Sequence, residues 1–193
     1  MPLPEKFVLF DTEFTSWEGA MARNWSGPGE YREVIQIGAI RVDKLQEAGS
    51  FCVYVKPIKN PELSAFIKEL TGISQETVDK EGKPLGEALS GFKDFVGDLP
   101  AYCYGSDEEV LRQNCALLNL PFPMEATRFV DIRQLITPYL ESRGIPVGQY
   151  SSGTLLQAFG KKTEHRAHDA VNDMRNLLEA LRELFGAPGG IGA

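Results

Sequence analysis

The hydrophobic positions of the chain fall into short continuous runs and longer stretches with helical spacing. The run Phe7–Phe10 is apolar throughout and is typical of a strand buried on both faces. Residues 33–42 and 49–55 are rich in Val, Ile and aromatic side chains and predict two paired strands. Shorter strands are expected at 101–104 and 127–132. The pattern therefore predicts five strands.

The remaining periodic stretches predict helices. One of them starts with Pro61 in its first turn, and another is expected to be capped by Ser74. Because the strands come first and then alternate with helices, we expect an α/β domain with a mixed five-stranded sheet flanked by helices. The predicted helices are 61–70, 75–79, 84–95, 107–118, 132–141, 153–159 and 169–184.

Two segments lack a helix or strand period. Residues 15–30 contain two Trp and three Gly and predict a long loop. The segment 186–193 is rich in Gly and predicts a flexible C-terminal tail. We therefore expect one domain over residues 1–185.

Composition narrows the class of protein. With 193 residues, 42% hydrophobic and 24% charged, the chain is typical of a globular domain. Its apolar runs are shorter than the ~20 residues that span a membrane, and its N-terminus lacks the pattern of a secretion signal. Cys52, Cys103 and Cys115 are interpreted as reduced, mostly buried thiols of a cytoplasmic protein. With so few Cys and His, a zinc site is not expected.

The net charge of −7 excludes a protein that coats nucleic acid by bulk electrostatics. It does not exclude an enzyme that acts on nucleic acid, because bound cations reverse the sign of the charge locally. The sequence does not decide between a monomer and a homodimer.

Four carboxylates lie where predicted elements end or begin. Asp11 and Glu13 end the first strand and point to one face, Asp107 follows another strand, and Asp173 lies near the start of the last helix. Alone, the first pair is typical of solvated acids and Asp107 of a helix N-cap. Together they would meet at one edge of the sheet, where α/β folds place ligands. Such a set favours Mg²⁺ or Mn²⁺.

A histidine near these acids would take a proton from water. His168 directly precedes the last helix and is our candidate for this base. His165 is the alternative, since it would share a helical face with Asp169 and Asp173 if the helix began early. Taken by itself, each of the two histidines is also typical of an exposed polar residue.

At this point the sequence resembles the DEDDh, or DnaQ-like, 3′–5′ exonucleases of the ribonuclease H-like superfamily. It is most similar to the small stand-alone enzymes related to the sporulation-pathway inhibitor and to the enzymes that trim histone mRNA and small RNAs. The motifs occur in family order over nearly the whole chain. They are Phe10-Asp-Thr-Glu-Phe14, Glu33–Ile40, Leu70-Thr-Gly-Ile-Ser74, Asp107-x-x-x-Leu111 and Ala167-His-Asp-Ala-x-x-Asp173.

The resemblance implies a ribonuclease H-like fold and hydrolysis at the 3′ end of DNA or RNA, releasing nucleoside 5′-monophosphates. It implies that Asp11, Glu13, Asp107 and Asp173 bind two divalent ions and that His168 is the general base. It also implies that Leu70 is a wedge against the terminal nucleotide.

Two features depart from the family pattern. Gly105 is separated from Asp107 by one residue where relatives have two, so Glu108 keeps the spacing while Asp107 keeps the pattern of the following helix. We choose Asp107. The segment from Phe14 to Arg32 is longer than in the smallest relatives.

The long loop leaves directly from Glu13, so its first residues are expected beside the acids. Its aromatic side chains would stack on the bases of a single-stranded or frayed 3′ end without regard to sequence. Phe14 and Trp17 are the expected substrate contacts, whereas Trp25 and Tyr31 are also compatible with simple packing of the loop. The basic residues Lys161, Lys162 and Arg166 would guide the backbone, or else form a solvated loop.

Other functions fit the sequence less well. A non-catalytic module of this fold that binds and regulates a partner protein has no reason to keep all five groups. A phosphatase with an aspartyl nucleophile would have Asp-x-Asp after the first strand, where this chain has Asp-x-Glu.

Overall fold

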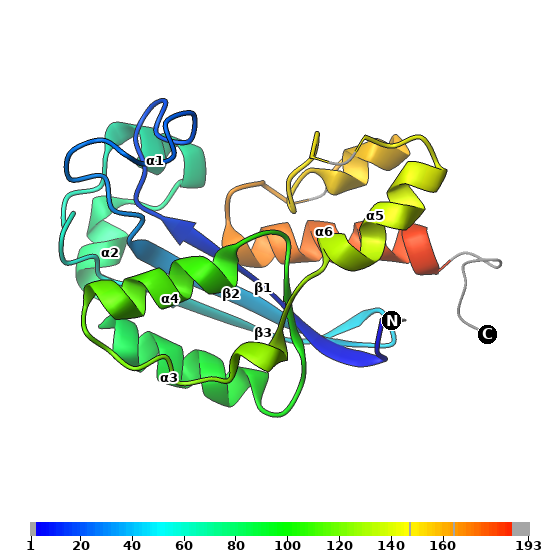
Figure 1. Ribbon diagram of the computed structural model, residues 1–193, viewed down its shortest axis with the longest axis horizontal. Helices are drawn as coiled ribbons and strands as arrows, with labels where there is room; N and C mark the ends of the chain where they lie inside the picture. The colour runs from blue at the N-terminus through cyan, green and yellow to red at the C-terminus, as the bar shows by residue number, and fades with distance from the viewer. Residues whose placement is uncertain (1–2, 147, 164, 187–193) are drawn as a thin grey trace.

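The strand β1 lies at the centre of a five-stranded sheet with the order β3-β2-β1-β4-β5 (Figure 1). The computed structural model describes residues 3–146, 148–163 and 165–186. β1 pairs with β2 antiparallel and with β4 parallel, and β4 pairs with β5 parallel. The strands are β1 (Lys6–Phe14), β2 (Val34–Asp43), β3 (Gln46–Tyr54), β4 (Ala101–Cys103) and β5 (Phe129–Asp131).

Helices cover both faces of the sheet and confirm the predicted architecture. α6 and α5 lie on one face, and α3 and α4 lie on the other (Figure 1). The α-helices are α1 (Ala65–Thr71), α2 (Gln75–Glu81), α3 (Leu85–Val96), α4 (Asp107–Leu117), α5 (Arg133–Ser142) and α6 (Ala170–Phe185). Two 3₁₀ helices are η1 (Ala126–Arg128) and η2 (Leu155–Phe159).

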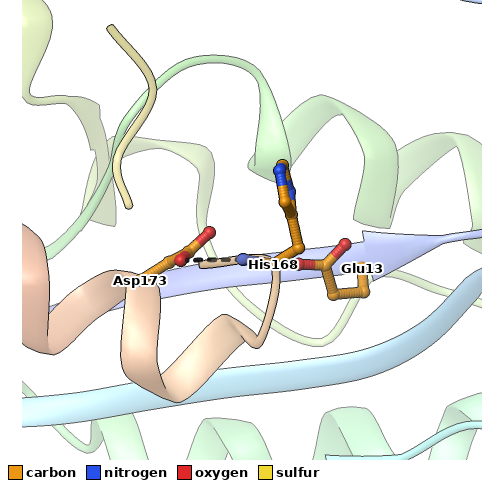
Figure 2. A group of neighbouring side chains, drawn as sticks. All are labelled: Glu13, His168 and Asp173. Carbon is orange, nitrogen blue, oxygen red and sulfur yellow. Dashed lines mark hydrogen bonds between the residues drawn. The ribbon is translucent and has the colours of Figure 1, made fainter. Parts of the chain in front are cut away.

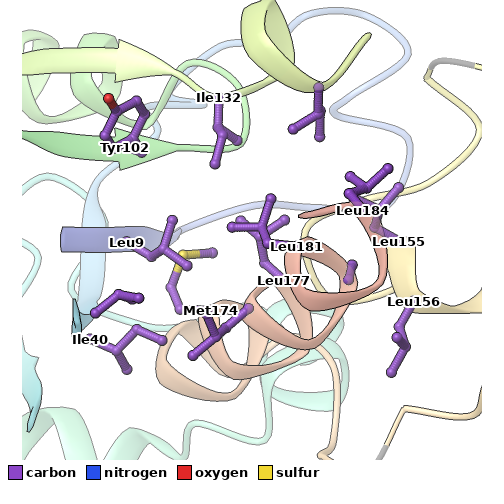
Figure 3. Packing of buried hydrophobic residues seen from close by; sticks show 14 of the residues in the cluster. Leu9, Ile40, Tyr102, Ile132, Leu155, Leu156, Met174, Leu177, Leu181 and Leu184 are labelled. Carbon is purple, nitrogen blue, oxygen red and sulfur yellow. The ribbon is translucent and has the colours of Figure 1, made fainter. Parts of the chain in front are cut away.

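The hydrophobic core lies on both faces of the sheet, because successive side chains of β1 point to opposite faces. Phe7 and Leu9 face α6, and Val8 and Phe10 face α3 and α4. All four are fully buried, as expected for a central strand covered by helices on both faces. Figure 3 shows Leu9 beside the apolar stripe of α6, which includes Met174, Leu177 and Leu181.

Two helices differ from the sequence prediction. The helix expected at 61–70 begins only at Ala65, because the Ser64 hydroxyl caps it by accepting a hydrogen bond from the Ile67 amide at 3.1 Å. Pro61 therefore lies outside the helix. The segment expected to be a helix at 153–159 is the 3₁₀ helix η2, with only Leu155–Phe159 helical. Ser74 does cap α2 as predicted.

The segment after β1 is a loop, as predicted, and its two ends are joined by hydrogen bonds. The Thr15 amide donates to the Glu33 carbonyl at 2.8 Å, and the Glu33 amide donates to the Thr15 hydroxyl at 3.0 Å. The buried Glu33 carboxylate also accepts from the amides of residues 58–60. Ser64 donates to the Ser16 carbonyl, which brings the loop beside α1 (Figure 1). Of the predicted flexible tail, residues 187–193 lie outside the described part.

Candidate active site

Asp11 and Glu13 project from β1 toward α6. They follow Phe7 and Leu9 on the same face of the strand, at the point where the apolar pattern ends. Their side chains are almost buried, with exposed fractions of 9% and 8%. Two acids are thus held side by side with little solvent around them.

Asp107 reaches the same site from α4. One oxygen of its carboxylate accepts hydrogen bonds from the Thr12 amide at 3.1 Å and from the Thr12 hydroxyl at 2.7 Å. Ser106, not Asp107, is the N-cap residue of α4. The carboxylate of Asp107 is therefore bound to β1 and does not cap its own helix. Glu108, the alternative acid, pairs with Arg112 on α4.

The end of α6 that carries Asp173 is fixed against β2. Gln36 accepts from the Ala170 amide at 3.0 Å and donates to Asp169, which caps the helix. Gly38 leaves room for this contact, because a Cβ there would lie 2.5 Å from the Val171 nitrogen. α6 can therefore approach the sheet closely enough for Asp173 to join Asp11 and Glu13.

His168 precedes α6 in a left-handed backbone conformation, with φ of 63°. Its amide donates to an oxygen of Asp173 at 3.1 Å, which is the dashed line in Figure 2. Since α6 begins only at Ala170, His165 does not share a helical face with Asp173. His165 is instead held through its carbonyl, which accepts from Asn176 at 3.2 Å.

Glu13, His168 and Asp173 form a tight group in which one possible ligand atom of each residue lies within 4.8 Å of the others (Figure 2). Asp11 and Asp107 interact electrostatically with this group. The structure thus brings together all five residues proposed from the sequence. Four carboxylates and one imidazole form a donor set suited to hard divalent cations.

Burial raises the pKa of all four carboxyl groups. Repulsion by the neighbouring acids of the site adds to the effect for Asp11, Glu13 and Asp173, whereas the hydrogen bonds from Thr12 oppose it for Asp107. The pKa of Glu13 rises to about 8, that of Asp173 to about 7 and that of Asp107 to about 6. The pKa of Asp11 is also raised well above its usual value, first by burial and then by Asp107. Keeping these groups ionised together requires positive charge between them, which a bound cation supplies. Burial and the nearby Arg166 lower the pKa of His168.

An apolar pocket of about 210 Å³ opens beside Glu13 and His168. Phe14, Trp17 and Leu70, the three expected substrate contacts, all line it. Trp25, for which packing was the alternative, lines it too. The pocket lining that the sequence analysis did not name as substrate contacts comprises Ser16, Gly19, Met21, Phe66 and Ile67. A flat apolar group can thus be held next to the carboxylates.

Trp25 combines a place in this pocket with packing inside the loop. Its ring lies 5.6 Å from that of Phe14 in a T-shaped arrangement, and the Arg32 guanidinium lies 5.1 Å from its centre. Its indole nitrogen donates to the Ser16 hydroxyl. Tyr31 borders a different pocket and is 46% exposed.

The expected basic cluster is not a single surface. Lys161 pairs with Glu183, nearly three turns beyond Asp173 on α6. Arg166 donates to the Glu69 carbonyl at the end of α1. Lys162 is exposed.

Comparison with known proteins decides the family. The model of the exonuclease family (RNase_T) matches residues 8–181. The chain belongs to this exonuclease family. It is 26% identical to the probable 3′-5′ exonuclease KapD of Bacillus subtilis, over 91% of this chain and 84% of that protein. It is 34% identical to the ERI1 exoribonuclease 2 of Xenopus laevis, over 94% of this chain and 28% of that protein.

Solved structures share the fold of this exonuclease. The nuclease domain of 3′hExo, a DEDDh family member bound to rAMP, superposes with a TM-score of 0.77 at 24% identity, covering 94% of this chain and 92% of that one. This likeness confirms the predicted fold. Membership of the exonuclease family, together with the group of Glu13, His168 and Asp173, supports the predicted dependence on divalent metal ions.

The chain spans about half the length of the 3′-5′ exoribonuclease 1 of rat and mouse, to which it is 26% identical. None of the helices in the described ranges combines the length and apolar character needed to cross a membrane.

Sequence reasoning missed the residues that hold the acids in place. Thr12 was overlooked between the two acids of β1, although a hydroxyl at that position can bind a neighbouring carboxylate. Gln36 is a fully buried amide within an otherwise apolar strand, and that polar interruption was the available signal. Gly38 and Gly153 matter because another segment approaches each of them closely. The backbone of α6 approaches Gly38 and the Asp173 carboxylate approaches Gly153, and nothing in the local sequence of either glycine indicates this.

Proposed function

We propose that this protein is a metal-dependent 3′–5′ exonuclease that hydrolyses phosphodiester bonds at the 3′ ends of DNA or RNA and releases nucleoside 5′-monophosphates. The observation that carries the proposal is the convergence of four buried carboxylates and His168 at the mouth of an apolar pocket. Its similarity to several 3′-5′ exonucleases and exoribonucleases supports the proposal.

Asp11, Glu13, Asp107 and Asp173 would hold two Mg²⁺ or Mn²⁺ ions, because all four offer the oxygen ligands that these cations prefer. Bound ions of this kind activate water and stabilise the charge that develops on the phosphate and the leaving 3′ oxygen. The carboxylates of Asp107 and Asp173 are oriented by Thr12 and by the His168 amide. The protein therefore presents its ligands in a fixed arrangement.

His168 would accept a proton from the attacking water at an imidazole nitrogen. Its side chain lines the apolar pocket and also belongs to the tight group with Glu13 and Asp173. Its lowered pKa keeps the imidazole neutral, and thus able to accept a proton, near neutral pH. We expect His168→Ala to lose far more turnover than His165→Ala at saturating metal, and the reverse order would transfer the role to His165.

The terminal nucleoside would occupy the apolar pocket. Phe14 and Trp17 offer aromatic faces for stacking, and Leu70 approaches from α1. Such contacts accept any base, which suits an enzyme that shortens a strand one nucleotide at a time. The substrate would be a single-stranded or frayed 3′ end.

A time course on 5′-labelled DNA and RNA oligonucleotides, single- and double-stranded, tests the proposal. With Mg²⁺ or Mn²⁺ we expect progressively shorter labelled products and release of nucleoside 5′-monophosphates. Excess EDTA should abolish the reaction, and Asp11→Asn should remove most of it. Full activity in EDTA, or in Asp11→Asn, would refute the metal mechanism.

We further propose that residues 1–185 act as one exonuclease domain in the cytoplasm. Cys52, Cys103 and Cys115 are free thiols, which is typical of a reducing compartment. Cys103 and Cys115 are buried as expected, whereas Cys52 is exposed.

A further inference from the structure

A tyrosine and an arginine lie just beyond the ends of β4 and β5, the two strands next to β1 on the side away from β2, and neither of them lines the apolar pocket. β1 and β4 run parallel, with Leu9 opposite Tyr102. Tyr104 directly follows the end of β4 and comes two residues after Tyr102, as Asp11 comes two residues after Leu9 on β1. Leu9, Tyr102 and Tyr104 belong to the α6 side of the core, so Tyr104 faces the same side as Asp11.

Arg133 covers Tyr104 and is held rigidly. Its guanidinium carbon lies 5.9 Å from the centre of the Tyr104 ring. Its Nε and Nη2 donate to Asp131 at 2.9 and 2.7 Å, and Asp131 also accepts from the Gly105 amide at 3.1 Å. The cation is thereby fixed at the ends of β4 and β5, where α5 begins.

Part of this guanidinium is free to bind a ligand. Among the residues that the structure describes, Nη1 of Arg133 has no hydrogen-bond acceptor, and 43% of the side chain is exposed. Arginine carries five N–H donors in a planar fork that matches the oxygens of a phosphate. A fixed and partly exposed guanidinium, in a chain whose net charge is −7, is suited to binding an anionic substrate.

The path that a bound nucleic-acid strand would take connects Arg133 and Tyr104 to the carboxylates. α1, which carries Leu70, and α5, which begins at Arg133, lie on opposite sides of the end of β1 (Figure 1). With the terminal nucleoside in the apolar pocket and the scissile phosphate at the carboxylates, the rest of the strand leaves the site away from α1. We infer that Arg133, steadied by Tyr104, binds a backbone phosphate on the 5′ side of the scissile bond. This inference rests on the proposed function.

The test compares two substrates for each variant. Thymidine 5′-(4-nitrophenyl phosphate) presents a terminal nucleoside and a scissile phosphate, but nitrophenol replaces the upstream nucleotide. A single-stranded oligonucleotide presents both sides. In Arg133→Gln we expect the ratio of kcat/KM for the oligonucleotide to that for the ester to fall about tenfold, because one charged hydrogen bond is lost.

Arg128 supplies a matched control. It precedes β5 as Arg133 follows it, and it pairs with Asp98 at 3.1 Å, away from the carboxylates. Arg128→Gln removes the same charge and should leave the ratio unchanged. Arg133→Lys, which keeps the positive charge, should restore part of the ratio.

Binding provides a readout that does not depend on turnover. With Ca²⁺ as the only divalent ion, fluorescence anisotropy of a labelled oligonucleotide should show weaker binding in Arg133→Gln. The slope of log affinity against log salt should be smaller by about 0.7. An unchanged slope and affinity, or the same change in Arg128→Gln, would overturn the inference. Equal losses on both substrates would overturn it too, because Arg133 would then act on the catalytic centre.

A different result would refute the proposed function. If the natural protein hydrolyses neither substrate with Mg²⁺ or Mn²⁺, the exonuclease proposal is refuted, and the anisotropy measurement still decides whether Arg133 binds a phosphodiester chain.

Discussion

Gly153 lies directly against the carboxylate of Asp173. A Cβ at position 153 would be 2.2 Å from Oδ1 and 2.7 Å from Cγ of Asp173. The same Oδ1 accepts the hydrogen bond from the His168 amide. The absence of a side chain at position 153 therefore allows the carboxylate to point at the other acids while it holds the backbone of His168.

Gly153→Ala should accordingly weaken metal binding. The carboxylate of Asp173 would have to turn away, and misplacing a ligand in this way costs about tenfold in metal affinity. The half-saturating Mn²⁺ concentration for activity measures the effect, and a thermal melt checks the fold. Gly49→Ala is the control, since a Cβ there would meet no atom within 4 Å. Equal metal requirements in both variants would contradict the prediction.

Asp107→Asn and Glu108→Gln should differ sharply. Asp107 is 8% exposed and is bound to Thr12, whereas Glu108 pairs with Arg112 on its own helix. We expect kcat to fall about 100-fold or more in Asp107→Asn, because a metal ligand loses its charge. Glu108→Gln should stay within about twofold, since a partly exposed pair on one helix contributes little and Glu108 is not bound to β1. If Glu108→Gln is the more damaged, the ligand was assigned to the wrong residue.

Trp17 and Trp25 should respond differently to truncation. Trp17 lines the pocket, so Trp17→Ala should raise KM for oligonucleotides about 5- to 100-fold with a normal melting temperature. Trp25 packs on Phe14, Arg32 and Ser16, so Trp25→Ala should lower the melting temperature by several degrees. A stable Trp17→Ala protein with unchanged KM would remove Trp17 from the binding site.

The stability of the metal-free protein should fall as the pH rises from about 4 to about 8. The carboxyl groups of Glu13, Asp173 and Asp107 have pKa values of about 8, 7 and 6 in the folded protein, against about 4 when unfolded. Within that window the folded state holds protons that the unfolded chain has released. Raising the pH therefore favours unfolding until these groups are ionised in both states.

Denaturant unfolding in EDTA at several pH values measures this dependence. Glu13→Gln should flatten it, because one of the shifted groups can no longer ionise, whereas Glu76→Gln, at an exposed position on α2, should not. Saturating Mg²⁺ should also reduce the loss at high pH by stabilising the ionised carboxylates. A protein that becomes more stable between pH 5 and pH 8 in EDTA would contradict the burial of these acids.

The sequence by itself determined the elements and the chemistry of the site. The apolar run before Asp11 marks a central strand, since only a strand covered on both faces is apolar at successive positions. The acid pair in β1 and the His168-to-Asp173 spacing follow from local order along the chain. Element boundaries were less exact where a side chain decides them, as at α1, where the Ser64 cap makes the helix begin at Ala65 and not at Pro61.

Only the tertiary structure decided how the acids are held and what lies around them. The contacts Thr12–Asp107 and Gln36–Ala170 join residues that are 95 and 134 positions apart, and no local pattern encodes such a pair. The same holds for the apolar pocket, whose walls come from the loop after β1, from α1 and from His168. The roles of Gly38 and Gly153 depend on how closely another segment approaches, and packing at that distance is set by the whole fold and not by the residues beside each glycine.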